Sequence, residues 1–439
     1  MMIKRPKGTQ DLSGRQLSRI QKVEETIRII MNDYRFNEVR TPVFESYDLF
    51  SRGVGNGTDV VSKEMYDFND KGDRHLALRP EGTASVVRAY IENKWFGPEF
   101  PNPFKAYYIG PMFRYERPQA GRMRQFHQLG CEVFGAVDPS VDVEVISLAM
   151  DLFSELGLKQ LKLLINSLGQ PADRQAYREA LINYLKPFEA ELSSDSQRRY
   201  LENPLRVLDS KDTKDQEIVK NAPKMIDFLS EGSRKHFDRV IELLELFEVP
   251  FEIDHQLVRG LDYYQDTVFE IVTNSKEFGA NTTICGGGRY DGLVESLGGP
   301  STPGIGFAAG MERLMMLLDI EAVDLNEVEP LDVYIASLGE EAEETVLKLM
   351  NQLRHLGYSV DRDYLGRKLR TQFKQAERQQ AQVVVTIGSE EVEKQEAVFK
   401  GQKTKKELSI HLDDLDESFD ALFNQLTLDS SVIDEYFKA

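Results

Sequence analysis

The spacing of apolar residues in the first 160 positions predicts a mixture of helices and strands. Residues 16–33 give the clearest helical pattern, with leucine or isoleucine at 17, 20, 27 and 30 on one side. An extended piece is expected at 41–44, because Pro42 disfavours helix at the residue before it. The other elements predicted in this part are strands at 76–79, 104–117 and 126–135, and helices at 84–93 and 141–156. The two long strands enclose a charged loop, 117–122, and therefore predict a hairpin with a polar tip.

The pattern changes between about 170 and 247, where charged helical segments dominate and glycine is scarce. This change predicts an inserted helical subdomain. Strand patterns return near 251–258 and 267–273. A run rich in glycine and proline, 298–306, then leads into a predicted helix at 307–318.

The last quarter of the chain predicts a separate small α/β domain. Residues 321–331 are acidic and contain a proline, as a linker would. Beyond them the predicted elements alternate, with strands at 333–336, 359–360 and 383–387 and helices at 342–355 and 367–380. Strands that alternate with helices of this length are typical of a mainly parallel sheet. A chain of 439 residues has room for two or three domains.

Composition and charge narrow the class of protein. The net charge of −19 argues against a protein that coats nucleic acid, because phosphate binding needs clustered lysine and arginine. The arginines concentrate at 114–124 and 367–378 instead, which fits an enzyme with local basic patches. The two cysteines lie far apart and no histidine or cysteine cluster has zinc spacing, so no structural metal is expected. With no secretory signal and no apolar run long enough to span a bilayer, a cytoplasmic protein without a membrane segment is expected.

Two short segments combine arginine, glycine and tyrosine more densely than a hydrophobic core requires. They are Arg259–Tyr264 and Gly286–Gly292, joined by the strand-like run at 267–273. Arginine offers a planar fork that binds phosphate through two hydrogen bonds, and glycine lets the backbone approach a bulky anion. Tyrosine adds an apolar wall with one polar group. The combination predicts a pocket for a phosphate and a small planar polar group; the alternative is a solvated hairpin.

The predicted hairpin carries a second cluster of polar residues. On a strand, side chains two positions apart share a face, so Arg114 and Glu116 are expected to point the same way. The return strand gives its matching face Phe126, Gln128 and Glu132. A face with a cation, two carboxylates, an amide and an aromatic ring predicts a ligand site. The alternative is an exposed hairpin whose charges pair across strands, each pair contributing only ~0.2–1 kcal/mol.

A third feature is the run Gly304–Arg313, which places glycines at the start of the predicted helix and a fixed charge at Arg313. Glycines in this position allow an anion to approach, but they serve close packing more often. The run is not a Walker loop, because no Gly-Lys-Ser/Thr follows.

Together these features resemble the class II aminoacyl-tRNA synthetases. The hairpin with Arg114 is similar to the second motif of that class and Gly304–Arg313 to the third. The segment Thr41–Glu45 resembles the first motif, which lies at the dimer interface in that class.

Four further segments resemble the bacterial-type histidyl-tRNA synthetases. They are Lys7–Asp11, Leu78–Thr83, Arg259–Tyr264 and Gly286–Gly292. The resemblance covers essentially the full length, and it departs from the family pattern only slightly, at Ser13-Gly14.

The resemblance implies an α+β protein in two parts. Residues 1–325 would form a class II catalytic domain with an antiparallel sheet and the helical insertion at about 170–247. Residues 331–439 would form an α/β anticodon-binding domain. Such a protein joins L-histidine to ATP as histidyl-adenylate, releases pyrophosphate, and passes histidine to the 3′ end of tRNA(His). A homodimer is implied as well.

The resemblance also assigns roles around ATP. Arg114 and Arg259, the catalytic pair, would grip the α-phosphate and the histidine carboxylate, and Arg313 would hold the γ-phosphate. Glu116 would bind the adenine amino group and Phe126 would stack on the adenine. Mg²⁺ is expected on the β- and γ-phosphates, with no metal site made by the protein alone.

Histidine would be recognised at both ends. Glu81, Gly82, Thr83 and Gln128 are expected around the ammonium group, and Glu132, Tyr263 and Tyr264 around the imidazole. A buried carboxylate left without a partner would reject apolar amino acids. His127 points away from this face and is expected to be a packed or surface residue.

For tRNA, the hairpin tip would contact the acceptor end through Arg117, Gln119 and Arg122. A helix of the last domain would bring Arg367, Lys368, Arg370, Lys374 and Arg378 near the anticodon stem, unless it is only a solvated face.

Three alternatives compete with this interpretation. A synthetase-like regulatory subunit of ATP phosphoribosyltransferase would lack the last domain and lose family residues that this chain keeps. A class II synthetase for another amino acid would not carry the segment Arg259–Tyr264. A simple tRNA-binding module would not need a buried polar pocket.

Overall fold

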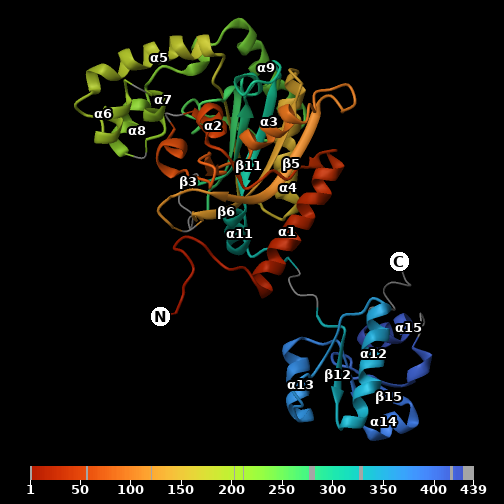
Figure 1. The fold of residues 1–439 in the computed structure, drawn as a ribbon. Coiled ribbons are helices and arrows are strands. Elements are labelled where there is room, and N and C mark those ends of the chain that lie inside the picture. The colour runs from red at the N-terminus through yellow and green to blue at the C-terminus, as the bar shows by residue number, and fades with distance from the viewer. Residues whose placement is uncertain are drawn as a thin grey trace. The chain divides into compact units, whose positions relative to one another are not determined.

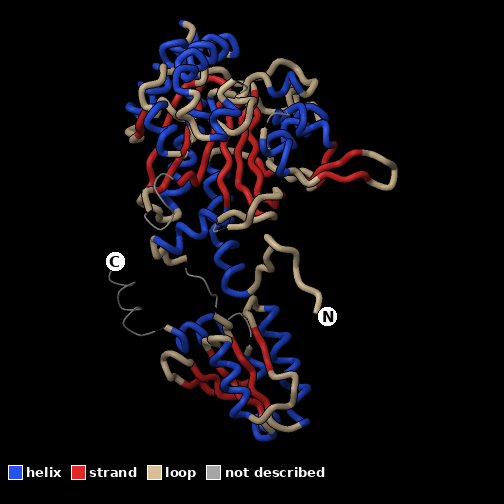
Figure 2. The backbone as a smooth tube through the Cα atoms, turned by 90° about the vertical axis from the view of Figure 1, so that its left-hand side faces the viewer, coloured by secondary structure: helices blue, strands red, loops and turns tan. Residues whose placement is uncertain are grey.

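The computed structural model describes residues 2–55, 58–119, 121–201, 203–210, 212–275, 282–325, 330–415 and 419–428. The chain folds as two compact units, Met1–Leu325 and Asn326–Ala439, each built around its own sheet (Figures 1 and 2). Within the described ranges, no helix is both long and apolar enough to cross a membrane.

The larger unit is built on an eight-stranded sheet in the order β1-β5-β6-β11-β10-β9-β7-β8. Neighbouring strands are antiparallel except at the two edges, where β1–β5 and β7–β8 are parallel. The strands are β1 (Asn37–Glu38), β5 (Phe104–Phe113), β6 (Gln125–Phe134), β7 (Leu161–Ser167), β8 (Phe251–Ile253), β9 (Gln265–Thr273), β10 (Thr282–Arg289) and β11 (Gly304–Gly310). The central strands β9, β10 and β11 are buried on both faces, and their middle positions are mostly apolar or small residues.

Helices cover both faces of this sheet (Figure 2). One face carries α1 (Gly14–Asp33), α4 (Pro139–Glu155), α9 (Glu231–Leu246) and α11 (Met311–Ile320), whose apolar sides share one core. The opposite face carries α3 (Thr83–Glu92) and α10 (Leu293–Ser296), packed with several tyrosines and phenylalanines. A small sheet of β2 (Phe44–Ser46), β4 (His75–Leu78) and β3 (Asp67–Asn69) and the short α2 (Tyr47–Phe50) complete this part. The predicted helices at 16–33, 84–93 and 141–156 are thus confirmed within a few residues.

The inserted helices are α5 (Pro171–Leu185), α6 (Ser194–Arg199), α7 (Leu205–Leu208) and α8 (Thr213–Val219), which lie together in Figure 1. They surround a core of their own that extends from Tyr177 to Leu229. The next helix, α9, instead buries Phe237, Val240 and Leu244 in the core of the main sheet. The separate core of the insertion therefore ends before α9, short of the predicted boundary near 247.

The predicted helix at 307–318 is wrong in its first turn, because the chain there is the strand β11, and α11 begins only at Met311. At positions 304 and 306 of this strand, between β6 and β10, there is room only for glycine. A Cβ atom on Gly306 would lie 2.1 Å from Glu132 Oε2, and one on Gly304 would lie 2.3 Å from the Tyr290 ring. Gly304 and Gly306 therefore serve close packing inside a sheet, whereas a Cβ atom on Gly310 would meet nothing within 4 Å.

The predicted hairpin is present, but its first strand is shorter than expected. The strand β5 ends at Phe113, so Arg114 and Glu116 lie in the loop that follows, and the argument from strand alternation does not apply to them. The backbone N–H of Arg114 still donates to the carbonyl of Arg124 across the hairpin at 2.9 Å. On β6 the alternation of Phe126 and Gln128 is as predicted.

The smaller unit has a five-stranded sheet in the order β13-β12-β14-β15-β16. The strands β12 (Val333–Ser337), β13 (Val360–Arg362) and β14 (Val383–Ile387) are parallel, as predicted. The strands β15 (Glu396–Gly401) and β16 (Glu407–His411) add antiparallel pairs that the prediction of a mainly parallel sheet missed. The helices α12 (Glu343–His355) and α15 (Phe419–Thr427) pack on one face, α13 (Leu369–Arg378) packs on the other, and α14 (Ser389–Lys394) joins β14 to β15.

Candidate active site

The larger unit contains a cavity of about 430 Å³, a volume within the range of small-molecule sites. It is walled by the start of α3, the β5–β6 hairpin, the segment before β9, the middle of β10 and the start of α11. These are the segments that the sequence pattern singled out. The predicted residues that line the cavity are Glu81, Thr83, Arg114, Glu116, Arg122, Phe126, Gln128, Arg259, Tyr263, Tyr264 and Arg313.

Two arginines of the wall are fixed by single hydrogen bonds to backbone carbonyls. Arg114 Nε donates to the carbonyl of Pro80 at 2.8 Å, and Arg313 Nη1 donates to the carbonyl of Thr283 at 2.7 Å. The Arg114 guanidinium also lies 5.4 Å from the centre of the Phe126 ring. A guanidinium has five N–H donors, so both arginines can bind an anion while keeping these contacts.

Arg259 is held more firmly than the other two arginines. It forms an ion pair with Glu270 on β9 and lies 5.3 Å from the centre of the Tyr264 ring. Burial lowers the pKa of Arg259, but the attraction of Tyr264 and Glu270 outweighs it and raises that pKa overall. The side chain lies on Gly286, where a Cβ atom would be 2.4 Å from Arg259 Nη1. The first glycine of the predicted segment is therefore required by the approach of this arginine.

Glu132 lies behind the cavity wall and is almost completely buried. It accepts a hydrogen bond from the Thr83 hydroxyl at 2.8 Å and another from the Tyr290 hydroxyl. Burial raises the pKa of its carboxyl to about 8, although these two hydrogen bonds oppose the shift. Thr83 lines the cavity itself, so the carboxylate is one side chain away from a ligand.

The start of α3 presents a second buried carboxylate. Glu81 accepts hydrogen bonds from the backbone N–H groups of Thr83 at 2.7 Å and Ala84 at 2.9 Å. Burial raises the pKa of Glu81, and these hydrogen bonds act in the opposite direction. Gly82, a predicted ligand, lies against the Tyr108 ring, where a Cβ atom would come within 2.2 Å. Close packing is thus the constraint that the structure places on Gly82.

The predicted tRNA residues lie at the tip of the hairpin. Arg117, Gln119 and Arg122 are exposed. The backbones of Gln119 and Arg122 close the tip through hydrogen bonds of 3.1 and 2.9 Å. Arg122 also forms an ion pair with Glu116 at 3.3 Å and so connects the tip to the cavity. Ala120, within the predicted tip, lies outside the described residues.

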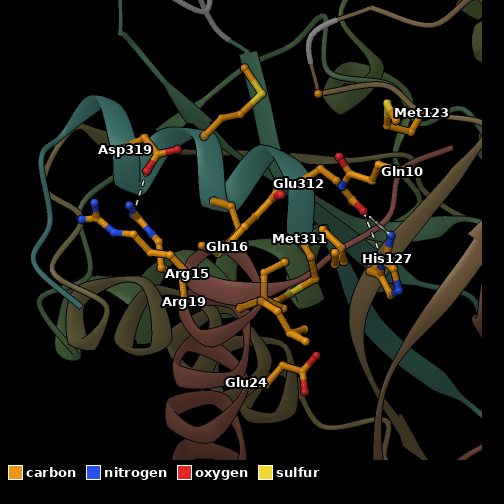
Figure 3. A pocket seen from close by; sticks show the side chains of 16 residues that line it. Gln10, Arg15, Gln16, Arg19, Glu24, Met123, His127, Met311, Glu312 and Asp319 are labelled. Carbon is orange, nitrogen blue, oxygen red and sulfur yellow. Dashed lines mark hydrogen bonds and ion pairs between the residues drawn. The ribbon is translucent and has the colours of Figure 1, made fainter. Parts of the chain in front are cut away.

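A second cavity, of about 700 Å³, lies between α1 and α11 (Figure 3). His127 faces it, on the side of β6 opposite Phe126 and Gln128, as the alternation predicts. The His127 backbone N–H donates to both carboxylate oxygens of Glu312 at 3.0 Å. Glu312 lines both cavities, so this contact joins the start of α11 to the hairpin strand.

Several residues of the site were missed from the sequence. Glu270 lies in the strand-like run at 267–273 and Tyr290 lies in the segment Gly286–Gly292, which had both been singled out. The pairing of β9 with β10 places Glu270 beside Gly286. Arg206, from the inserted helix α7, donates to the carbonyl of Gly260 at 2.7 Å. Glu64 also lines the cavity. Nothing in the local sequence of Arg206 or Glu64 indicates that either reaches the site.

The buried carboxyl of Glu132 predicts a pH dependence of stability. Glutamate in the unfolded chain titrates near pH 4.5, whereas Glu132 in the folded chain has a pKa of about 8. Between these values the folded chain binds more protons, so the free energy of unfolding falls as pH rises. Glu132→Gln cannot ionise and is expected to reduce this fall by a few kcal/mol between about pH 5 and 8.5. Urea unfolding of the wild type and of Glu132→Gln at these two pH values measures how far the free energy of unfolding falls in each protein. An equal fall in both proteins would contradict the prediction.

The mainly antiparallel sheet, the arginine-bearing hairpin and the arginine at the start of α11 define the catalytic domain of a class II aminoacyl-tRNA synthetase. A family model described as Histidyl-tRNA synthetase matches residues 8–314, and one described as Anticodon binding domain matches residues 332–422. The chain belongs to the histidyl-tRNA synthetase family.

Individual relatives agree with this assignment. A histidine–tRNA ligase of Ligilactobacillus salivarius is 53% identical over 423 residues, which cover 96% of this chain and 98% of that protein. The crystal structure of apo S. aureus histidyl-tRNA synthetase is 42% identical, with a TM-score of 0.80 over 97% of this chain and 100% of that chain. A Bacillus halodurans structure described as an ATP phosphoribosyltransferase regulatory subunit/histidyl-tRNA synthetase is 21% identical, with a TM-score of 0.64 over 89% of this chain and 99% of that chain, and it supports the fold alone.

Proposed function

We propose that this chain is a histidine–tRNA ligase, which uses ATP to activate L-histidine and then transfers histidine to the 3′ end of tRNA(His). The match to histidine–tRNA ligases over nearly the whole chain is the observation that carries the proposal. The anticodon-binding domain at 332–422 favours it over a regulatory subunit, which would not need that domain.

In the first step, a carboxylate oxygen of histidine attacks the α-phosphorus of ATP. A new P–O bond forms, the bond to the β-phosphate oxygen breaks, and pyrophosphate leaves with the bonding electrons. This reaction needs aligned reactants and compensated charge more than a proton-transfer group. We assign Arg114 and Arg259 to the α-phosphate and the histidine carboxylate, and Arg313 to the γ-phosphate. The support is that all three guanidinium groups line one cavity.

The adenine end of the site would lie against the hairpin. Phe126 presents an aromatic surface beside Arg114, so a base stacked on it would leave its phosphates near that cation. Glu116 lines the same wall and would accept from the adenine amino group.

The histidine end would use the buried polar groups around α3. Gln128 Oε1 is buried and, among the described residues, accepts no hydrogen bond, which suits it to the ammonium group together with Glu81 and Thr83. Tyr263 and Tyr264 would flank the imidazole of the bound histidine. Glu132 would either accept a hydrogen bond from the imidazole N–H or position the Thr83 and Tyr290 hydroxyls that contact the ring. An apolar side chain would leave these groups without partners, which is how such a site rejects it.

Mg²⁺ would enter with the phosphates of ATP. This ion keeps several waters and takes one or two carboxylates beside phosphate oxygens, rather than a cage made by the protein. Glu270 is a carboxylate of the cavity wall that fits this demand. The ion would offset the charge of the leaving pyrophosphate.

A cytoplasmic homodimer is the proposed state of the protein. Val43 and Phe44, in the segment that resembles the first motif, are 40% and 52% exposed, so an apolar surface is available there. Light scattering is expected to give about twice the chain mass of 50.2 kDa; a mass near that of one chain would contradict the dimer.

Charging of a tRNA(His) transcript tests the function directly. With histidine, ATP and Mg²⁺, the purified protein is expected to attach histidine to this transcript and not to a tRNA of another specificity. A folded protein that activates no amino acid and charges no tRNA would favour the regulatory subunit instead.

A further inference from the structure

We propose that Arg174 and Arg206, two arginines of the inserted helices, are positioning residues for the binding of histidine, because they hold the backbone of the segment Arg259–Tyr264 in its place at the cavity wall. The inserted helices would then form part of the amino-acid site. This inference rests on the ligase function proposed above and deepens it, since it adds two residues to the histidine end of the site.

The segment Arg259–Tyr264 has little support from the backbone around it. It runs between β8 and β9 and belongs to neither a helix nor a strand. Of the backbone hydrogen bonds described outside helices and strands, one involves this segment: the Asp262 N–H donates to the Val54 carbonyl, and at 3.4 Å this bond is long. The segment nevertheless carries Arg259 and two tyrosines of the cavity wall. These side chains can keep their places only if other groups fix the backbone.

The inserted helices supply this support through three hydrogen bonds. Arg206 on α7 donates from Nη2 to the carbonyl of Gly260 at 2.7 Å. Arg174 on α5 donates from Nη1 to the carbonyl of Tyr264 at 2.8 Å and to that of Asp262 at 3.4 Å. Among the described residues, the hydrogen bonds of these two guanidinium groups go to no other acceptor. Three alternate carbonyls of the segment thus accept from charged donors, which form stronger hydrogen bonds than neutral ones do.

These hydrogen bonds lie next to the side chains that would contact the substrates. Gly260 directly follows Arg259, Asp262 directly precedes Tyr263, and Tyr264 is itself part of the cavity wall. A shift of the backbone at these carbonyls would therefore move the arginine and both tyrosines together. A displacement of only ~1 Å of a group that orients a substrate can cost about 10²-fold in rate.

Other contacts connect the inserted helices to the same wall. Val258, just before the segment, packs against the core of the insertion and against the aromatic core beside α3. Arg199 on α6 forms an ion pair with Asp59 at 3.5 Å, and Asp59 lines the cavity. The insertion therefore contacts the cavity wall at two separate segments of the chain.

A positioning role accounts for both arginines, whereas direct contact with a substrate accounts for one. Arg206 lines the cavity and is within reach of a ligand there. Arg174 lies against a separate, smaller cavity of about 210 Å³. What the two arginines have in common is the backbone to which they donate. Arg174 is therefore the more informative residue to change.

Histidine-dependent ATP–pyrophosphate exchange by the full-length protein tests the proposal. Arg174→Met is expected to raise KM for histidine about 10-fold, and Arg206→Met about 5-fold, through loss of hydrogen bonds from a charged donor. KM for ATP is expected to change less than about 3-fold, because most groups assigned to ATP lie on the hairpin and on α11. Arg206→Lys is expected to keep most of the wild-type KM, since one ammonium donor can satisfy one carbonyl. The control is Arg198→Met, an exposed arginine whose hydrogen bonds stay within α6, with an expected change below about 2-fold.

The split between the kinetic constants separates positioning from other roles. A variant that only destabilised the fold would lower kcat through the loss of active protein and leave KM for histidine unchanged, and this result would overturn the positioning role. A larger rise in KM for ATP than for histidine would overturn it as well, because it would indicate direct binding of the nucleotide. If Arg174→Met does not fold, Arg206→Met and Arg206→Lys give the same comparison. Absence of exchange in the wild type would instead overturn the ligase function.

Discussion

Replacing Arg259 by alanine is expected to lower kcat/KM for histidine-dependent ATP–pyrophosphate exchange by about 10³-fold. The Arg259 side chain is only 16% exposed, paired with Glu270 and packed on Tyr264, so its charge sits in the cavity before substrates arrive. Charge that develops on the α-phosphate in the transition state would meet a cation that needs no reorganisation. Removing it also leaves Glu270 without its ion pair in the same wall, which adds repulsion toward phosphate.

Two matched variants separate these contributions. Arg259→Lys keeps the charge but loses the planar fork, and it is expected to restore only a small part of the rate. Glu270→Gln keeps Arg259 and is expected to be far less damaging than Arg259→Ala. Thermal unfolding of each variant controls for loss of structure. If Arg259→Ala retained exchange within about 10-fold of the wild type while folded, the assigned role would be wrong.

Replacing Arg289 by alanine is expected to lower the free energy of unfolding of the larger unit by about 3–5 kcal/mol. Arg289 and Asp142 are 1% and 0% exposed. Arg289 Nε lies 3.0 and 2.9 Å from the two oxygens of Asp142, and Nη2 lies 2.6 Å from Asp142 Oδ2. The same guanidinium donates to the carbonyls of Ala136 at 3.1 Å and Asp138 at 3.2 Å.

The cost arises because alanine leaves Asp142 charged and buried with His236 as its remaining partner, at 3.1 Å. Both His236 and Arg289 hold the pKa of Asp142 below its ordinary value against the effect of burial. Urea unfolding of the full chain, followed by a probe of the larger unit, measures the loss. The double variant Arg289→Met/Asp142→Leu, which removes both charges, is expected to recover part of it; a loss below about 1 kcal/mol for Arg289→Ala would contradict the account.

The sequence predicted much of this molecule where a local rule was sufficient. Apolar spacing located α1 and α3, and strand alternation separated His127 from Phe126 and Gln128. The close approach of Arg259 explains Gly286, which the sequence alone identified only as part of an unusually glycine-rich segment. For the helices and the hairpin strand, the physical cause acts between residues that are near in sequence, whereas the contact of Arg259 with Gly286 joins separate segments.

Local rules failed where distant segments decide the structure. The run Gly304–Gly310 is a strand because it pairs with β10 on one side and β6 on the other, and β6 is far away in sequence. Arg206 reaches the site only because the inserted helices fold back toward Gly260. Helix α9 likewise belongs to the core of the main sheet because it packs against α4, which is far away in sequence.

The cavity around Arg259 is proposed to activate histidine, and amino-acid-dependent ATP–pyrophosphate exchange measures this step itself. Purified protein is incubated with ATP, Mg²⁺ and labelled pyrophosphate, with each of the common amino acids in turn. Exchange is expected with histidine, and none above background with the others. Exchange driven by a different amino acid, or by none from folded protein, would contradict it.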